Sequence, residues 1–159
     1  MQPHHPVLAA LAAVLVLAAC GAEPPIPAAD KASAPQEAIV RAGDTTIRAS
    51  VVQTSTLGAG VASQYGIRRA PGTVMLLVAV RTGDDGDESA VPARVTATAT
   101  DLRGQRQDIA MRELRVGDLL DYVGTVETTL PDALRFDVTI VREGGATSSM
   151  HFTREFFPQ

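Results

Sequence analysis

Residues that could carry catalysis are few in this chain of 159 residues. Beyond residue 20 there is one histidine, His151, and a Ser-His-Asp arrangement would need it as the general base. Its neighbours Met150 and Phe152 belong to the inner face of a predicted strand, so His151 points outward. The chain also lacks a Gly-x-Ser-x-Gly turn. We therefore predict an exposed structural histidine and no catalytic residues.

Metal ligands are equally scarce. A zinc site needs three or four histidine, cysteine or carboxylate ligands, and the chain offers one histidine beyond residue 20 and one cysteine. The acidic loop 84–88 has carboxylate oxygens that could hold calcium. However, Gly86 is misplaced for an EF-hand, and Val95 stands where the distal glutamate belongs. A solvated loop is the simpler interpretation, and we predict no metal and no cofactor.

Two adjacent arginines, Arg68 and Arg69, follow Tyr65 and the helix end predicted at Gly66. Their guanidinium groups could hold a phosphate or carboxylate in a forked geometry. On an extended segment adjacent side chains point to opposite faces, so a joint grip would need a turn. Tyr65, Arg68 and Arg69 are binding candidates, and ordinary surface charge is the alternative.

The one cysteine, Cys20, ends a segment whose residues 7–19 are all Val, Leu or Ala. A membrane-spanning helix needs roughly 20 apolar residues, so this run is too short to span. Its length and the small residues before Cys20 are typical of a signal peptide. The segment resembles a bacterial lipoprotein signal, in which the chain is cut before a lipidated cysteine. This implies a signal peptide over 1–19 and, on Cys20, a diacylglyceryl group plus an amide-linked acyl chain.

Two details refine this resemblance. Residues 1–6 contain no lysine or arginine, which departs from the usual basic start of a signal peptide. Gly21 stands where an aspartate would mark retention in the inner membrane, which implies the outer membrane. An ordinary secretory signal is the alternative, but it would leave an unpaired thiol in an oxidising compartment.

The rest of the chain is mildly acidic and long enough for one domain. Lysine and arginine number 14 against 18 aspartates and glutamates, for a net charge of −4 without a basic cluster. This charge excludes nucleic acid as an expected partner. Residues 21–37 are rich in alanine and proline and predict an extended tether after Cys20. A single domain is therefore expected over 38–159.

The elements that would position any site are strands. Residues 73–80 are apolar on both faces and predict a central strand, whereas 134–140 alternate cleanly. Further stretches that predict strands are 45–53, 91–102, a return strand carrying Ile109 and Met111, 120–126 and 147–157. About seven strands at intervals of about ten residues predict an all-β antiparallel sandwich of immunoglobulin-like order. One short helix is predicted near 57–66.

The segment 61–69, Val-Ala-Ser-Gln-Tyr-Gly-Ile-Arg-Arg, resembles the core motif of a proteobacterial family of domains of unknown function. Members of that family are small periplasmic or lipid-anchored proteins. Other stretches that fit its pattern are 97–105, Tyr122, 134–136 and 152–157. The resemblance covers most of 43–157 and implies the fold and the compartment, but no reaction. Arg48-Ala49-Ser50 departs from a His-Tyr-Asn-like run of the family, so no family site is carried over to these positions.

Two classes of function follow. The anchor, the tether and the scarcity of catalytic groups favour a non-catalytic, lipid-anchored periplasmic protein that binds or positions an envelope protein. The alternative is a hydrolase or other enzyme with a dispersed carboxylate site, drawn from Asp101, Asp108, Asp118 and Asp121. Nothing in the spacing of these four aspartates recommends a pair.

Overall fold

The computed structural model of the chain describes residues 36–84 and 86–159. The predicted signal peptide, Cys20 and most of the predicted tether lie outside the described residues, as does Asp85 of the acidic loop. The first strand begins at Gln36, two residues before the predicted start of the domain. No helix in the described part of the chain is long and apolar enough to cross a membrane.

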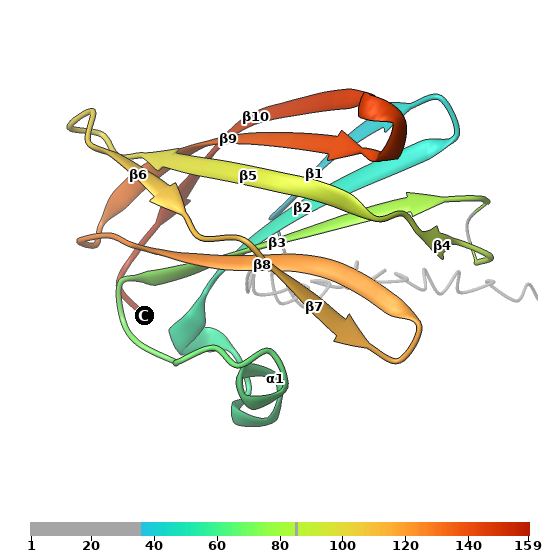
Figure 1. Ribbon diagram of the computed structural model, residues 1–159. Coiled ribbons are helices and arrows are strands. Elements are labelled where there is room, and N and C mark those ends of the chain that lie inside the picture. The colour runs from blue at the N-terminus through green and yellow to red at the C-terminus, as the bar shows by residue number, and fades with distance from the viewer. Residues whose placement is uncertain (1–35, 85) are drawn as a thin grey trace, which may run out of the picture. The chain divides into compact units, whose positions relative to one another are not determined.

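Two antiparallel β-sheets pack face to face around one core (Figure 1). The six-stranded sheet has the order β1-β2-β3-β8-β7, with the short β4 paired to β3. Its strands are β1 (Gln36–Ala42), β2 (Thr45–Gln53), β3 (Thr73–Thr82), β4 (Ser89–Ala90), β7 (Arg112–Val116) and β8 (Leu119–Glu127). The four-stranded sheet has the order β10-β9-β5-β6. Its strands are β5 (Ala93–Thr100), β6 (Arg106–Ile109), β9 (Asp132–Arg142) and β10 (Thr147–Phe156).

The strand order is that of an immunoglobulin-like sandwich. The series β2-β3-β8-β7 in one sheet and β10-β9-β5 in the other reproduces the order of a constant-type immunoglobulin domain. The predicted all-β sandwich is therefore confirmed. The return strand predicted with Ile109 and Met111 is present as β6, which pairs with β5 and carries the buried Ile109. Its predicted extent is wrong, because the chain changes sheets between Ile109 and Met111. β6 ends at Ile109, and β7 begins at Arg112 in the other sheet.

This crossing passes close over Gly124 of β8. A Cβ atom at Gly124 would lie 2.6 Å from the Ile109 side chain and 2.9 Å from the Met111 sulfur. Side chains at position 124 would therefore push the crossing segment away from the sheet. A strand glycine of this kind commonly marks a place where another part of the backbone approaches closely.

The core follows the alternation of the strands. On β9 the inward residues Leu134, Phe136, Val138 and Ile140 are all buried, as predicted. On β5 the predicted inward residues Val95, Ala97 and Ala99 are buried too. Phe136 stacks on Phe152 with ring centroids 5.2 Å apart and meets Phe156 edge to face at 6.5 Å. These aromatic contacts join the two neighbouring strands β9 and β10 inside the core.

The predicted short helix is present as α1 (Ala59–Gln64), after a 3-10 turn at Thr54–Thr56. A second, smaller apolar cluster lies on the outer face of the six-stranded sheet, where Met75, Leu114 and Val123 are buried. Leu57, Tyr65 and Ile67 from the segment around α1 pack against this cluster. The segment therefore covers part of a sheet face that would otherwise be exposed and apolar.

The two ends of the sandwich differ (Figure 1). The loop end, on the left of the figure, carries the β5–β6 turn (101–105), the β8–β9 loop (128–131) and the C-terminal residues 157–159. The hairpin end, on the right, carries the β7–β8 tip (117–118) and the β9–β10 turn (143–146).

Candidate functional site

Four polar side chains form one row across the outer face of the four-stranded sheet. The strand register pairs His151 of β10 with Asp137 of β9, Asp137 with Thr98 of β5, and Thr98 with Asp108 of β6. The sequence neighbours of each residue point into the core, so these four point outward. Strands lie about 4.8 Å apart, and the row therefore runs across the full width of the sheet.

Asp137 is the best-connected member of the row. The Nδ1 atom of His151 lies 2.7 Å from Oδ1 of Asp137, and an ionised carboxylate only accepts, so Nδ1 donates. The Nε atom of Arg135 lies 3.6 Å from the other carboxylate oxygen. The hydrogen bond from His151, helped by the charges of Arg135 and Arg106, lowers the pKa of Asp137 despite its partial burial. Asp137 is therefore a fixed negative charge among cationic groups.

A shallow hollow of about 420 Å³ lies beside this row. β6 pairs only with residues 97–100 of β5, so the first half of β5 is left uncovered on that side. The hydroxyl oxygen of Thr98 is buried there and has no hydrogen-bond partner. The residues that line the hollow are Val95, Thr96, Ala97, Thr98, Arg106, Asp108, Ile109, Met111, Asp137 and Thr139.

This arrangement is suited to binding and poorly suited to nucleophilic catalysis. A nucleophilic hydroxyl must contact the histidine that removes its proton, but Asp137 stands between His151 and Thr98 in the row. The hollow presents hydroxyls, a guanidinium and carboxylates together, which can donate and accept hydrogen bonds to a polar ligand. Within the described residues, no three His, Cys, Asp or Glu side chains converge to hold a metal ion.

The three binding candidates from the sequence have separate local partners. Tyr65 packs in the small apolar cluster, and its carbonyl accepts a hydrogen bond from Arg112. Arg69 donates to the carbonyl of Ser55 at 2.9 Å, whereas Arg68 is highly exposed and lies 3.9 Å from Glu127. The two guanidinium groups have different contacts and do not share one partner. Joint binding of an anion by Arg68 and Arg69 stays a prediction.

The four aspartates considered for an enzyme lie in four different places. Asp101 is buried in the β5–β6 turn, and Asp108 lines the hollow. Asp118 is exposed at the tip between β7 and β8, and Asp121 pairs with Arg81. In the acidic loop, Glu88 pairs with Arg48 at 2.8 Å.

The outward position of His151 was predictable from the sequence, but the places of Asp137, Thr98 and Arg106 in the site were not. The one signal available was the β9–β10 hairpin, whose turn at 143–146 sets Asp137 opposite His151. Thr98 and Asp137 are far apart in the chain, and only the pairing of β5 with β9 brings them together.

Comparisons with known proteins agree with this fold. The family described as "Domain of unknown function (DUF4426)" matches residues 39–159. Among curated proteins, none matches the chain. The structure is similar to the crystal structure of a DUF4426 family protein from Pseudomonas aeruginosa PAO1, with a TM-score of 0.64 and 24% identity. That similarity covers 77% of this chain and 96% of the other.

Two further structures are similar at lower identity. FetP from uropathogenic Escherichia coli strain F11, expressed recombinantly in the E. coli periplasm, has a TM-score of 0.53 and 10% identity over 79% of this chain and 97% of its own. A copper-bound variant of FetP has a TM-score of 0.51 and 12% identity, over 79% and 92% of the two chains. Similarities at these identities establish a common fold.

Proposed function

The chain belongs to the DUF4426 family, whose function is unknown, and from this premise we propose that it is a non-catalytic binding domain anchored by lipid in the bacterial envelope. In this proposal the protein works at the periplasmic face of the outer membrane and positions an envelope protein there. The outer face of the four-stranded sheet is its contact surface.

Two observations, one from the sequence and one from a similar structure, support the proposed location. Cys20 follows Leu17-Ala18-Ala19 at the end of an apolar run that has the length of a signal peptide. A domain of the same fold, FetP, was produced in the periplasm. One acyl chain binds membranes only reversibly, whereas two or more hold a protein stably. The multiply acylated cysteine implied by the lipoprotein resemblance would therefore be a lasting anchor.

The hollow beside the His151–Asp137–Thr98–Asp108 row is the observation that carries the binding proposal. Arg106 and Arg135 supply positive charge, and Asp108 and Asp137 supply negative charge, at backbone positions set by the strand register. Complementary charges across an interface orient a partner and reject wrong ones. A protein surface with alternating charges and few apolar groups is therefore the partner that fits.

Copper, which one FetP structure contains, does not suit the residues that the structure describes. Copper sites draw on imidazole and thioether ligands. His151 points outward, but the adjacent Met150 is buried in the core. Met75 is buried in the small cluster on the other sheet. Met111 lines the hollow, but His151 does not. No imidazole therefore joins a thioether at one place in the described part of the chain, and the proposal includes no copper site.

The competing proposal is a hydrolase with a carboxylate site, and Asp108 is its best member because it lines the hollow. A panel of envelope hydrolase substrates separates the two proposals. Turnover that Asp108→Asn abolishes, in a protein that remains folded, would favour the enzyme.

Replacing Cys20 by alanine should abolish lipid attachment. The thiol is the atom that would carry the lipid, so the variant should take up no labelled fatty acid and should remain as uncleaved or mislocalised precursor. Growth with a labelled fatty acid, followed by immunoprecipitation and membrane fractionation, measures both effects. Label that still enters the Cys20→Ala protein would contradict the anchor.

A photoreactive amino acid at Thr139, on the edge of the hollow, should crosslink to one reproducible envelope protein in cells. The same group at Thr125, on the outer face of the other sheet, is the matched control and should not. Arg106→Glu should reduce the Thr139 crosslink several-fold by reversing the local charge, while Arg115→Glu on β7 should leave it unchanged. An equal crosslink from Thr125, or no effect of Arg106→Glu, would count against this contact surface.

A further inference from the structure

Two large apolar side chains stand exposed beside each other at the loop end. Leu102, in the β5–β6 turn, is 76% exposed, and Phe157, just after β10, is 57% exposed. Both line one small groove of about 160 Å³, together with Pro131, Asp132, Ala133 and Glu155. Single exposed apolar residues are common on protein surfaces. Here the two most exposed large apolar side chains of the described residues share one groove.

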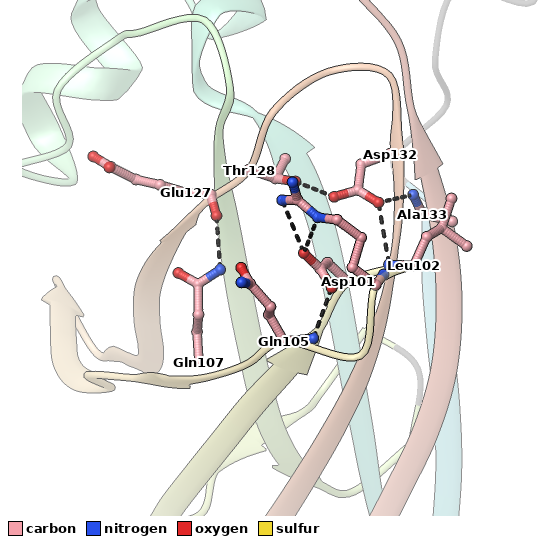
Figure 2. A network of polar contacts seen from close by, with 9 residues as sticks. Asp101, Leu102, Gln105, Gln107, Glu127, Thr128, Asp132 and Ala133 are labelled. Carbon is pink, nitrogen blue, oxygen red and sulfur yellow. Dashed lines mark hydrogen bonds and ion pairs between the residues drawn. The ribbon is translucent and has the colours of Figure 1, made fainter.

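A network of carboxylate hydrogen bonds holds the backbone around this groove (Figure 2). Asp101 accepts from the amides of Gln105 at 2.8 Å and Arg103 at 2.9 Å, and from the Arg103 guanidinium. Burial raises the pKa of Asp101, but these hydrogen bonds outweigh burial and lower it below its ordinary value. The turn that presents Leu102 is therefore closed around an ionised carboxylate.

A second carboxylate ties this turn to the β8–β9 loop. Asp132 accepts from the backbone amides of Leu102 at 3.3 Å and Ala133 at 2.8 Å, and from the hydroxyl of Thr128. Figure 2 shows Asp132 between the two loops, joined to both. Preorganisation of this kind reduces the entropy lost on binding.

The chain from the anchor arrives close to the same end. Gln36 is paired with Val51 near the end of β2, and the side chain of Gln53 donates to the carbonyl of Phe157 at 2.8 Å. Arg154, three residues before Phe157, lies 3.4 Å from the carbonyl of Glu37. A fully extended chain from Cys20 to Gln36 spans at most about 55 Å. The loop end therefore lies near the point where the chain from Cys20 joins the domain.

We propose that the loop end lies against the bilayer that holds Cys20, with Leu102 and Phe157 in its interfacial layer. This proposal rests on the lipid anchor of the proposed function. Apolar side chains bind the interface in proportion to the area they bury, and two alone would bind weakly. The tether, however, keeps the domain within about 55 Å of the bilayer, so weak contacts need only orient a domain that the anchor already holds there. The outer face of the four-stranded sheet then stays accessible to a partner.

The test uses the full acylated protein in vesicles of phosphatidylethanolamine and phosphatidylglycerol at three to one. Because Cys20 is acylated, a fluorophore attaches only to an introduced cysteine. Gln105→Cys reports on the loop end, where the Gln105 side chain takes no part in the network. Asp118→Cys is the matched control, since it lies beside Leu119, another exposed leucine, at the hairpin end. Lipids with a quencher on the acyl chain measure the depth of each label.

The label at 105 should be quenched several-fold more than the label at 118. High salt should not remove the difference, because the contact is apolar, and Leu102→Ser should reduce quenching at 105 to the level of 118. Equal quenching at both positions, in protein that floats with the vesicles, would overturn the membrane contact of the loop end but would not contradict the lipid anchor. Protein that does not float with the vesicles would overturn the anchor and this proposal together.

Discussion

Replacing Phe136 by alanine should lower the free energy of unfolding by about 3–5 kcal/mol, the usual cost of truncating a buried phenylalanine. Phe136 is fully buried on β9 and contacts the rings of both Phe152 and Phe156. The loss combines the lost burial of the ring with the cavity it leaves. A domain is stable by about 5–15 kcal/mol in total, so much of the variant should be unfolded at growth temperature.

The matched control is Arg135→Ala, one position away on the same strand. Its side chain is 59% exposed and makes one ion pair of 3.6 Å with Asp137. Exposed pairs of this kind contribute about 0–1 kcal/mol. Chemical denaturation followed by circular dichroism compares the two variants. Similar midpoints would contradict the inward position of Phe136 and the alternation of β9.

Arg81→Met should cause the second large loss, about 3–5 kcal/mol, the range for removing one partner of a buried ion pair. Arg81 is 7% exposed, and its guanidinium donates to the carbonyls of Val80 at 3.1 Å and Leu120 at 2.9 Å. It also donates to the carboxylate of Asp121. Without Arg81 these acceptors lose a donor, and the largely shielded carboxylate of Asp121 is left without its partner.

The second substitution Asp121→Leu, added to Arg81→Met, should recover part of this stability. Replacing both partners of a buried pair by apolar groups is often neutral. Arg115→Met is the control, because Arg115 also forms an ion pair, with Glu113 at 3.1 Å, while both side chains are more than half exposed. The same denaturation experiment measures all three variants. If Arg81→Met costs no more than Arg115→Met, the buried pair does not hold β3 and β8 together.

The alternating strands were the most predictable part of this fold. Residues 134–140 show their inward and outward faces directly, because a strand buried on one face selects apolar residues at every second position. The crossing between Ile109 and Met111 was not predictable in the same way. Both residues are apolar and occupy alternate positions, which one continuous strand would also produce.

The candidate site was less predictable than the fold. An outward histidine at 151 follows from local alternation, but its role depends on Asp137, and the hollow depends on Thr98 and Arg106. These residues come from three other strands and meet through the sheet register. Tyr65, Arg68 and Arg69 lie close together in the sequence, but each has a different local partner.

Local sequence was enough to predict the β-sandwich and the short helix, and the lipoprotein-like segment before Cys20 stays a prediction of the same local kind. These features depend on residues close together in the chain, whose spacing controls local conformation and recognition. Tertiary structure alone decided that Arg81, at the end of an apolar strand, is buried against Asp121. It likewise decided that Leu102 and Phe157 share one groove. Such pairs lie tens of residues apart, and their contact depends on which strands become neighbours, which is a property of the whole packed chain.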